Sequence, residues 1–213
     1  MLQIWGRETS SNVQAVMWCV GELGLTYQRY DVGHHFGGLD SEAFYQLNPN
    51  RTIPVLQDDN HPPLWESGAI LRYLASRYGQ ESFWPKDIFA RSEVDRWAEW
   101  AKVSVSSLFT QPIFWQLVRT PSQQRDPAAI DQAIARFEDK LAIAEQQLSQ
   151  HPFLAGPVFT LADIQFGHLL YRYYQLNIGV RDFPTLHAYY QRLTERPAYQ
   201  RHVMVSYQPL QVS

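Results

Sequence analysis

Polar residues of types that can stabilise an anion follow the first apolar run of the chain. The segment Arg-Glu-Thr-Ser-Ser-Asn spans residues 7–12, between a predicted strand and a predicted helix. The dipole and the free N–H groups at a helix N-terminus favour an anion and lower the pKa of a thiol held there. Ser10, Ser11 and Asn12 can each donate a hydrogen bond to such a sulfur. The same residue types cap helices, so capping by Ser11 or Asn12 is the simpler interpretation of this segment alone.

A proline opens the apolar strand predicted over 54–57, within the segment Arg-Thr-Ile-Pro-Val-Leu of residues 51–56. If the Ile53–Pro54 peptide bond is cis, the backbone N–H and C=O of Ile53 turn outward and can bind a ligand. A trans proline at the start of a strand is the ordinary alternative, because cis X-Pro bonds are a minority in folded proteins. Taken alone, the segment favours the trans form.

The pair Glu66-Ser67 precedes a helix predicted over 67–78. A carboxylate bound at Ser67, as the expected N-cap, would meet the hydroxyl and the free N–H groups of the first turn. Glu66 could hold an ammonium group. Together the two residues complement an amino-acid head group, which carries one charge of each sign. The alternative is that Ser67 only caps the helix and that Glu66 is an exposed neighbour.

Alternating strand and helix patterns must position these three segments. Strands are expected at 2–6, 27–32, 54–57 and 64–65, and helices at 12–23, 40–47 and 67–78, in the order βαβαββα. A stretch with little periodicity at 80–87 is predicted to be a linker. Helical patterns then dominate 88–213, with helices over 88–118, over 126–149, from Thr160 and over 184–194, and Pro112 is expected to kink or break the first of them. The chain is therefore predicted to hold an α/β domain followed by an all-α domain.

The composition narrows the function classes. The 213 residues are 45% apolar and 18% charged with a net charge of −3, which is typical of a globular protein and gives no support to nucleic-acid binding. No signal peptide is expected, and no apolar run approaches the roughly 18 residues of a membrane span. The single cysteine, Cys19, forms no intrachain disulfide and fits a reducing compartment. We expect no metal site.

The order and joint spacing of the three segments resemble the cytosolic glutathione transferase superfamily, most nearly bacterial members with a Ser-(Ser/Thr)-Asn turn. The segment Gly-Pro-Val-Phe-Thr-Leu-Ala-Asp-Ile at 156–164 is similar to the family's capping box, with Asp163 reaching back to Thr160. The resemblance implies a thioredoxin-like, glutathione-binding domain over 1–79, a helical domain over 88–213 that forms the electrophile pocket, and a homodimer. It also implies a cytoplasmic, detoxifying enzyme.

The resemblance further implies roles for single residues. Ser10 is the best match to the serine that activates sulfur, with Ser11 and Asn12 as close competitors. Ile53 would pair through its backbone with the cysteinyl part of glutathione, and Glu66 and Ser67 would hold the γ-glutamyl group. The full set expected to bind glutathione, the co-substrate, is Arg7, Asn50, Arg51, Ile53, Pro54, Glu66 and Ser67.

The second substrate, a small apolar electrophile, is expected against the helical domain. The candidate wall of its pocket is Trp100, Phe109, Phe114, Trp115 and Arg119, although the aromatic rings could equally belong to the core. Arg7 and Arg119 could each hold a negative charge on either substrate. His34 and His35 could approach the glycyl end of glutathione, although exposed loop histidines are the simpler interpretation.

The departures from other family members narrow the mechanism. Cys19 lies about two turns into its helix, where it is expected to pack as an apolar residue, so a cysteine-based reductase mechanism is disfavoured. The absence of histidine between His61 and His151 disfavours histidine-assisted catalysis from the long helix. A glutathione-dependent isomerase, dehalogenase or ether-cleaving enzyme and a non-catalytic binding module remain as rival functions.

Overall fold

The computed structural model of the protein describes residues 1–212, and its N-terminal part is built on one mixed sheet. The strands β1 (Leu2–Trp5), β2 (Tyr27–Tyr30), β3 (Val55–Asp58) and β4 (Leu64–Trp65) lie in the order β2-β1-β3-β4. β1 pairs in parallel with β2 and antiparallel with β3, which in turn pairs antiparallel with β4. The four strands expected from the sequence are confirmed, with ends shifted by one or two residues.

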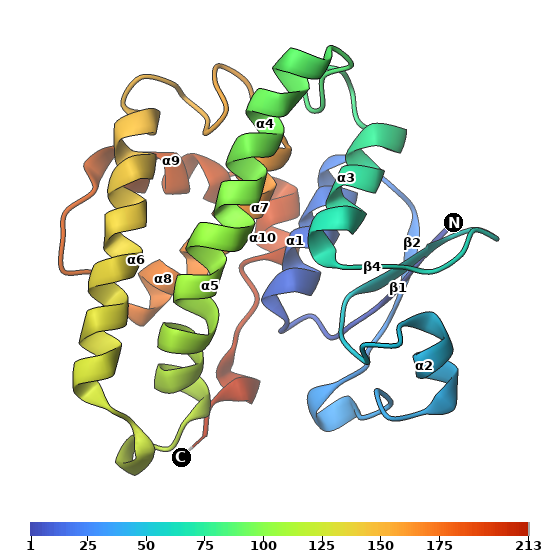
Figure 1. The fold of residues 1–213 in the computed structure, drawn as a ribbon, viewed down its shortest axis with the longest axis horizontal. Coiled ribbons are helices and arrows are strands. Elements are labelled where there is room, and N and C mark those ends of the chain that lie inside the picture. The colour runs from blue at the N-terminus through green and yellow to red at the C-terminus, as the bar shows by residue number, and fades with distance from the viewer. Residues whose placement is uncertain (213) are drawn as a thin grey trace.

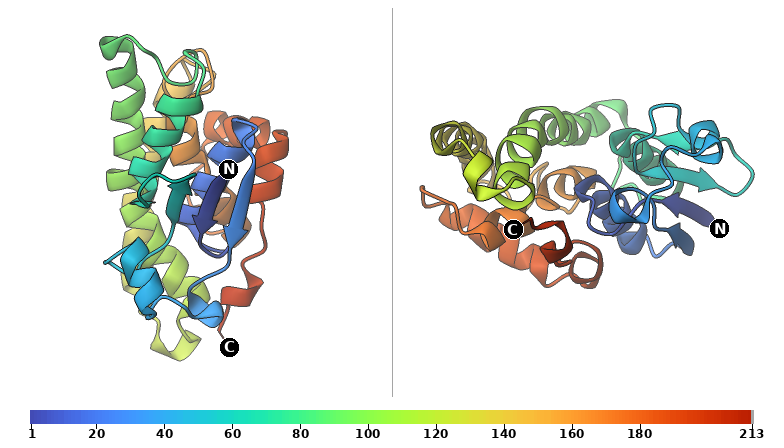
Figure 2. Two further views of the ribbon diagram at one scale, coloured as in Figure 1. Left: turned by 90° about the vertical axis from the view of Figure 1, so that its right-hand side faces the viewer. Right: turned by 90° about the horizontal axis from the view of Figure 1, so that it is seen from below.

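Three helices complete this α/β part, in the predicted order. They are α1 (Ser11–Glu22), α2 (Glu42–Leu47) and α3 (Ser67–Tyr78). α1 and α3 lie side by side between the sheet and the C-terminal helices, whereas α2 lies on the side of the sheet away from those helices (Figures 1 and 2). The two polar segments that begin α1 and α3 are therefore neighbours beside the helical part.

The C-terminal part is built from helices joined by loops. Its α-helices are α4 (Ile88–Trp100), α5 (Ser106–Phe109), α6 (Pro127–Leu148), α7 (Leu161–Gly167), α8 (Leu170–Leu176), α9 (Pro184–Thr194) and α10 (Pro197–His202). The predicted start of α6 is confirmed: the Asp126 side chain caps it by accepting from the N–H of Ala129 at 3.1 Å, and Pro127 is the first helical residue. The short helices α8 and α10 were not predicted from the sequence.

The first long helix continues through its proline. π-helical segments over Ala101–Val105 and Thr110–Arg119 flank α5, so the chain stays helical from 88 to 119. Of the two outcomes expected at Pro112, a kink or a break, the break does not occur, because the described chain is helical on both sides of this residue. Proline lacks the N–H that an α-helical turn requires, and the wider hydrogen-bonding pattern of a π-helix accommodates that loss. Such π-helical turns frequently occur at functional sites.

A buried capping box fixes the start of α7. As predicted, the carboxylate of Asp163 reaches back to Thr160, accepting from its N–H at 2.8 Å and from its hydroxyl at 3.2 Å. The other carboxylate oxygen accepts from the N–H of Leu154 and from the hydroxyl of Tyr189, both at 2.9 Å. Burial raises the pKa of Asp163, and these four donors act against that effect. One carboxylate thus joins α7, α9 and the loop before α7.

The core runs through both parts of the chain. The ring of Trp18 in α1 is fully buried and packs edge-on against Tyr199 of α10, with ring centroids 4.7 Å apart. Cys19 is fully buried beside it, which confirms that this residue packs as an apolar side chain, and burial raises the pKa of its thiol. Among the described residues, no helix is long and apolar enough to cross a membrane.

Candidate active site

The turn between β1 and α1 presents a serine at the start of the helix. Ser10, and neither Ser11 nor Asn12, is the N-cap of α1, because its backbone is extended (φ −85°, ψ 124°) and its carbonyl accepts from the N–H of Gln14 at 2.8 Å. Within residues 1–212 its side chain makes no capping hydrogen bond. The simpler interpretation of this segment therefore assigned the cap to the wrong residues, and the Ser10 hydroxyl can serve a ligand.

The peptide bond between Ile53 and Pro54 is cis. The ordinary expectation of a trans proline is therefore wrong, and the cis alternative raised from the sequence is confirmed. Asn48, which is fully buried, shapes the approach to this bond. Its amide nitrogen donates to the Thr52 carbonyl at 2.9 Å, and its amide oxygen accepts from the N–H of Asn50 at 2.9 Å. The loop before β3 is thus fixed by one buried side chain.

Ser67 is the first residue of α3 and not its N-cap, which corrects the sequence-based assignment. The cap position belongs to Glu66, whose φ of 67° lies in the left-handed region that residues with a side chain seldom adopt. Ser67 is 2% exposed, whereas the Glu66 side chain is exposed. Backbone strain of this kind concentrates at ligand-binding sites. The hydroxyl of Ser67 lies beside the unsatisfied N–H groups of the first turn of α3.

A lysine from the first π-helical segment connects the two polar segments. The Nζ atom of Lys102 donates to the Ser67 hydroxyl oxygen at 2.7 Å and to the Asn12 amide oxygen at 3.0 Å. The Ser67 hydroxyl donates to the same amide oxygen at 3.3 Å. Since the amide oxygen of Asn12 accepts both bonds, its NH₂ group is the end available to a ligand.

The charge of Lys102 has only uncharged hydrogen-bond partners in this cluster. Burial lowers the pKa of Lys102, and the charges of Glu66 and Glu99 act in the opposite direction. A largely buried ammonium is stabilised best by an anion at hydrogen-bonding distance. The site beside Ser67 therefore suits a carboxylate. Lys102 was not among the site residues predicted from the sequence, although a lone lysine among Ala98, Ala101 and Val105, which form an apolar and buried helix face, was a usable signal.

A pocket of about 370 Å³ opens over this cluster. Its lining comes from the start of α1 and from one side of the long helix: Ser11, Asn12, Lys102, Ser106, Ser107, Thr110, Gln111 and Trp115. Sulfur-activating candidates and helical-domain residues therefore meet at one cavity. Most of the lining residues carry a polar group, and Trp115 is the one aromatic residue among them.

Comparison with known proteins gives the family. Models of the glutathione S-transferase N-terminal domain and C-terminal domain match residues 9–77 and 106–197. Glutathione S-transferase GstB of Escherichia coli is 36% identical over 206 residues, covering 96% of this chain and 99% of that protein. The chain belongs to the glutathione S-transferase family.

Solved structures of glutathione S-transferases agree over the whole chain. The theta class enzyme of Xanthomonas axonopodis pv. citri, with glutathione bound, is 41% identical with a TM-score of 0.91, covering 96% of this chain and 98% of that one. A glutathione S-transferase of Pseudomonas fluorescens is 30% identical with a TM-score of 0.79, covering 96% and 99%. The glutathione S-transferase fold, a thioredoxin-like part followed by a helical part, is thereby shown for this chain.

The predicted wall of the electrophile pocket is only partly at the pocket surface. Trp115 is 38% exposed and lines the cavity, and the Arg119 guanidinium lies 4.5 Å from the centre of its ring. Phe109 and Phe114 are each 1% exposed and belong to the core, where they pack on Phe137 and Tyr207. Trp100 packs on Phe166, with ring centroids 5.8 Å apart, and is also outside the lining.

Two of the residues expected to bind glutathione have other partners in this glutathione S-transferase. The Arg51 guanidinium donates to the Leu39 carbonyl at 3.0 Å and lies 5.1 Å from the Tyr45 ring centre, so it ties the loop before β3 to α2. The Asn50 side chain donates to Asn48 within the same loop. His34 and His35 are exposed in a 3-10 turn, as expected.

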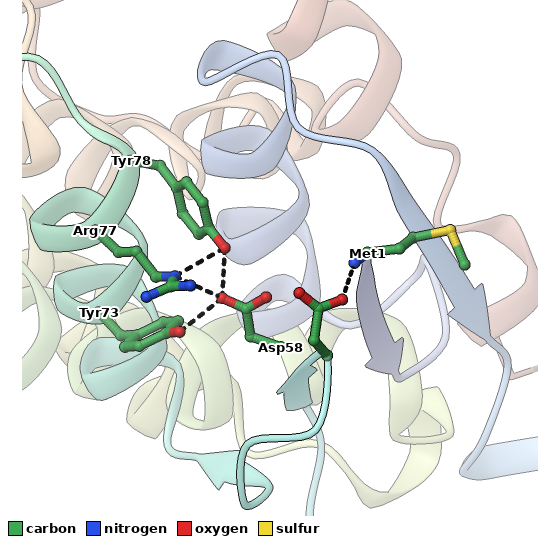
Figure 3. Close-up of polar contacts among 6 residues, drawn as sticks. Met1, Asp58, Tyr73, Arg77 and Tyr78 are labelled. Atoms are coloured by element: carbon green, nitrogen blue, oxygen red, sulfur yellow. Dashed lines mark hydrogen bonds and ion pairs between the residues drawn. The ribbon is translucent and has the colours of Figure 1, made fainter.

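A buried aspartate at the end of β3 holds α3 against the sheet (Figure 3). Asp58, 3% exposed, accepts from the hydroxyls of Tyr73, at 2.6 Å, and Tyr78, and it pairs with Arg77 at 3.0 Å. Burial alone would raise the pKa of Asp58, but the two hydroxyls and the Arg77 charge outweigh it and the pKa is lowered. This cluster fixes the helix that presents Ser67.

Proposed function

We propose that the protein binds glutathione, stabilises its thiolate and transfers it to a small electrophile. The observation that carries this proposal is the contact between Lys102, Ser67 and Asn12, since it joins a carboxylate-binding group and an amide donor in one pocket. The glutathione bound to the Xanthomonas axonopodis relative supports the same ligand here.

The chemistry of each group suggests how glutathione lies. The γ-glutamyl carboxylate accepts from the Ser67 hydroxyl, the first-turn N–H groups of α3 and the ammonium of Lys102. The γ-glutamyl ammonium pairs with Glu66, and the cysteinyl backbone pairs with Ile53 beside the cis bond. This orientation directs the sulfur toward the N-terminus of α1, where Ser10 and the NH₂ group of Asn12 are the candidate donors.

Catalysis then consists of pKa lowering and proximity. The helix dipole and one or two hydrogen bonds favour the thiolate, and the thiol proton leaves to solvent. The sulfur forms a bond to the electrophilic carbon, and the electron pair of the broken bond departs with the leaving group. No residue of the protein is covalently modified.

Ultraviolet difference absorbance of bound glutathione across pH tests this proposal in the wild type and in Ser10→Ala, Ser11→Ala and Asn12→Ala. We expect the bound thiol to titrate below free glutathione and one variant to lose the effect, which names the donor. Binding without thiolate at neutral pH would contradict the conjugation mechanism. Failure of the wild type to bind glutathione would favour a non-catalytic module.

The proposal also assigns a role to each of the two domains. Residues 1–79 hold glutathione and residues 88–213 supply the electrophile pocket, joined by the segment 80–87.

We further infer a cytoplasmic homodimer with a detoxifying role. Ile88 and Phe89, at the start of α4, support a self-association surface because they are 71% and 79% exposed. Light scattering of the wild type and of Phe89→Ser checks this, with monomeric wild type as the contradicting result.

A further inference from the structure

Three arginines from separate elements act on one another through their charges near the turn between β1 and α1. Arg7 follows β1, Arg119 ends the second π-helical segment, and Arg172 belongs to α8. The Arg172 Nη2 atom donates to the Thr9 carbonyl at 2.7 Å, and its guanidinium lies 4.3 Å from the centre of the Phe114 ring. The Arg119 guanidinium lies on the ring of Trp115, and the charges of both Arg7 and Arg119 act on Arg172.

The positive charge of this arginine cluster is not neutralised by a carboxylate. In the described part of the chain, arginine–carboxylate ion pairs form at Arg29, Arg72, Arg77, Arg96, Arg181 and Arg196, and the Glu8 carboxylate of this turn pairs with Arg29. Arg172 is 3% exposed, and its acceptors are the uncharged oxygens of Thr9 and Gln14. The charges of Arg7 and Arg119 add to burial in lowering the pKa of Arg172 to about 9. Positive charges that lie close together at a partly buried site favour the binding of an anion there.

Unpaired polar atoms in the same cluster indicate the same ligand type. The buried side-chain atoms without a partner within residues 1–212 include Arg7 Nε, Thr9 Oγ1, Gln14 Nε2 and Arg172 Nε. Thr9, Gln14 and Arg172 are each less than a tenth exposed. Buried donors left unpaired are costly, so such a group usually serves a ligand or ordered water. An anion with several acceptor oxygens satisfies donors and charges together.

We propose that this arginine cluster binds a carboxylate on the electrophile, so that the second substrate is a small anionic electrophile. This inference rests on the proposed function and changes the expected apolar substrate class. Arg119 is partly exposed and lies on Trp115, which lines the pocket above Asn12. An arginine guanidinium presents paired donors that match a carboxylate in geometry as well as in charge.

A matched pair of electrophiles tests the charge preference. In 4-chloro-3,5-dinitrobenzoate and 4-chloro-3,5-dinitrobenzamide, the thiolate forms a bond to the ring carbon, and chloride leaves with the electron pair of the broken bond. We expect the enzymatic kcat/KM, divided by the uncatalysed rate, to favour the benzoate by about tenfold or more. Arg119→Met should lower the value for the benzoate by about 10- to 100-fold and that for the benzamide by less than about threefold.

Direct binding separates this inference from the proposed function. Titration calorimetry with 3,5-dinitrobenzoate, which has no leaving group, needs neither glutathione nor turnover. We expect binding by the wild type that weakens with added salt, weakens at least about tenfold in Arg119→Met and Arg7→Met, and is unchanged in Arg136→Met, an exposed arginine of α6. Loss of thiolate formation with this binding intact would contradict the proposed function alone.

Three results would overturn the anionic-electrophile inference. The first is that 3,5-dinitrobenzoate does not bind the wild type. The second is an equal effect of Arg119→Met on both electrophiles. The third is a raised KM for glutathione in Arg119→Met with an unchanged ratio between the electrophiles, because that would assign the cluster to a carboxylate of glutathione itself.

Discussion

The Nζ atom of Lys102 lies 2.7 Å from the hydroxyl oxygen of Ser67, across the boundary between the helical part and the sheet-bearing part of the chain. Ser67 begins α3, and Lys102 lies in the π-helical segment after α4. A ligand carboxylate at this point would contact both parts of the protein at once. Glutathione binding and the relative position of the two parts are therefore expected to be coupled.

Replacement of Lys102 by methionine should weaken glutathione binding by about 10- to 100-fold, because one charge-assisted hydrogen bond to a carboxylate is lost. The side chains are similar in length, so the packing beside Ala101 and Val105 is largely kept. Titration calorimetry measures the affinity. Lys102→Arg should retain more of the affinity than Lys102→Met does.

Two glutathione analogues identify the group that Lys102 binds. Glutaryl-Cys-Gly keeps the γ-glutamyl carboxylate and lacks the ammonium, whereas 4-aminobutyryl-Cys-Gly keeps the ammonium and lacks that carboxylate. Lys102→Met should weaken binding of the first analogue and leave binding of the second nearly unchanged. Equal losses for both would mean that Lys102 acts on the fold and not on this carboxylate.

Replacement of Asn12 by aspartate should separate its two roles. A carboxylate still accepts from Lys102 and Ser67, but it replaces the NH₂ donor with an oxygen that repels a thiolate. We expect the bound thiol to titrate at higher pH and kcat to fall by about 100-fold, the scale of losing one preorganised donor to an anion. Ultraviolet absorbance of the thiolate and steady-state rates report these effects. A thiolate as abundant as in wild type would assign activation to Ser10 or Ser11.

The stability of the protein in acid should depend on Asp58. Its pKa is lowered in the folded state, so its carboxylate stabilises the fold above the ordinary value of about 3.9, and this stabilisation is lost as the pH falls through the folded pKa. Asp58→Asn should be less stable than wild type at pH 7 and should lose less stability below about pH 4. Urea denaturation at a series of pH values checks this, and parallel curves for the two proteins would be the contrary outcome.

The capping box should be the most sensitive polar site of the helical part. Asp163→Ala leaves the N–H groups of Leu154 and Thr160 and the hydroxyl of Tyr189 without their acceptor. We expect a loss of about 3–5 kcal/mol in the free energy of unfolding, since buried donors become unpaired. Asp163→Asn, which keeps one acceptor oxygen, should lose less. Denaturant unfolding measures both, and a loss below about 1 kcal/mol for Asp163→Ala would contradict this account.

Local patterns predicted the fold well because the relevant signals lie within single elements. The bounds of α3 at 67–78 and the start of α6 at Pro127 followed from apolar periodicity and capping residues. The start of α3 could not be resolved further: Glu66 adopts a left-handed conformation that its residue type disfavours, and this moves Ser67 one position into the helix. A strained position is imposed by its surroundings and leaves little trace in the local sequence.

The site was harder to predict because its groups meet through tertiary packing. Lys102 lies 90 residues from Asn12 along the chain, and local patterns do not determine which helix face approaches α1. Phe109 and Phe114 share the spacing and chemistry of pocket residues, yet both belong to the core. Trp115, next in the chain after Phe114, faces the pocket. The rotation of one helix, which residue type alone does not determine, separates these outcomes.

The π-helical turns let the long helix change its number of residues without turning its pocket-lining face. A π-helical turn holds more residues than the α-helical turn it replaces. Deleting one residue from 101–105 would therefore return this segment to a regular α-helix and leave the orientation of all that follows nearly unchanged. Deleting one residue from the regular turns of α4 would instead rotate all that follows by about 100°. Only that second deletion would turn Trp115 and Arg119 away from the α1 turn, with their own codons unchanged, so a single-codon deletion or insertion in α4 is a short evolutionary route to a new substrate range.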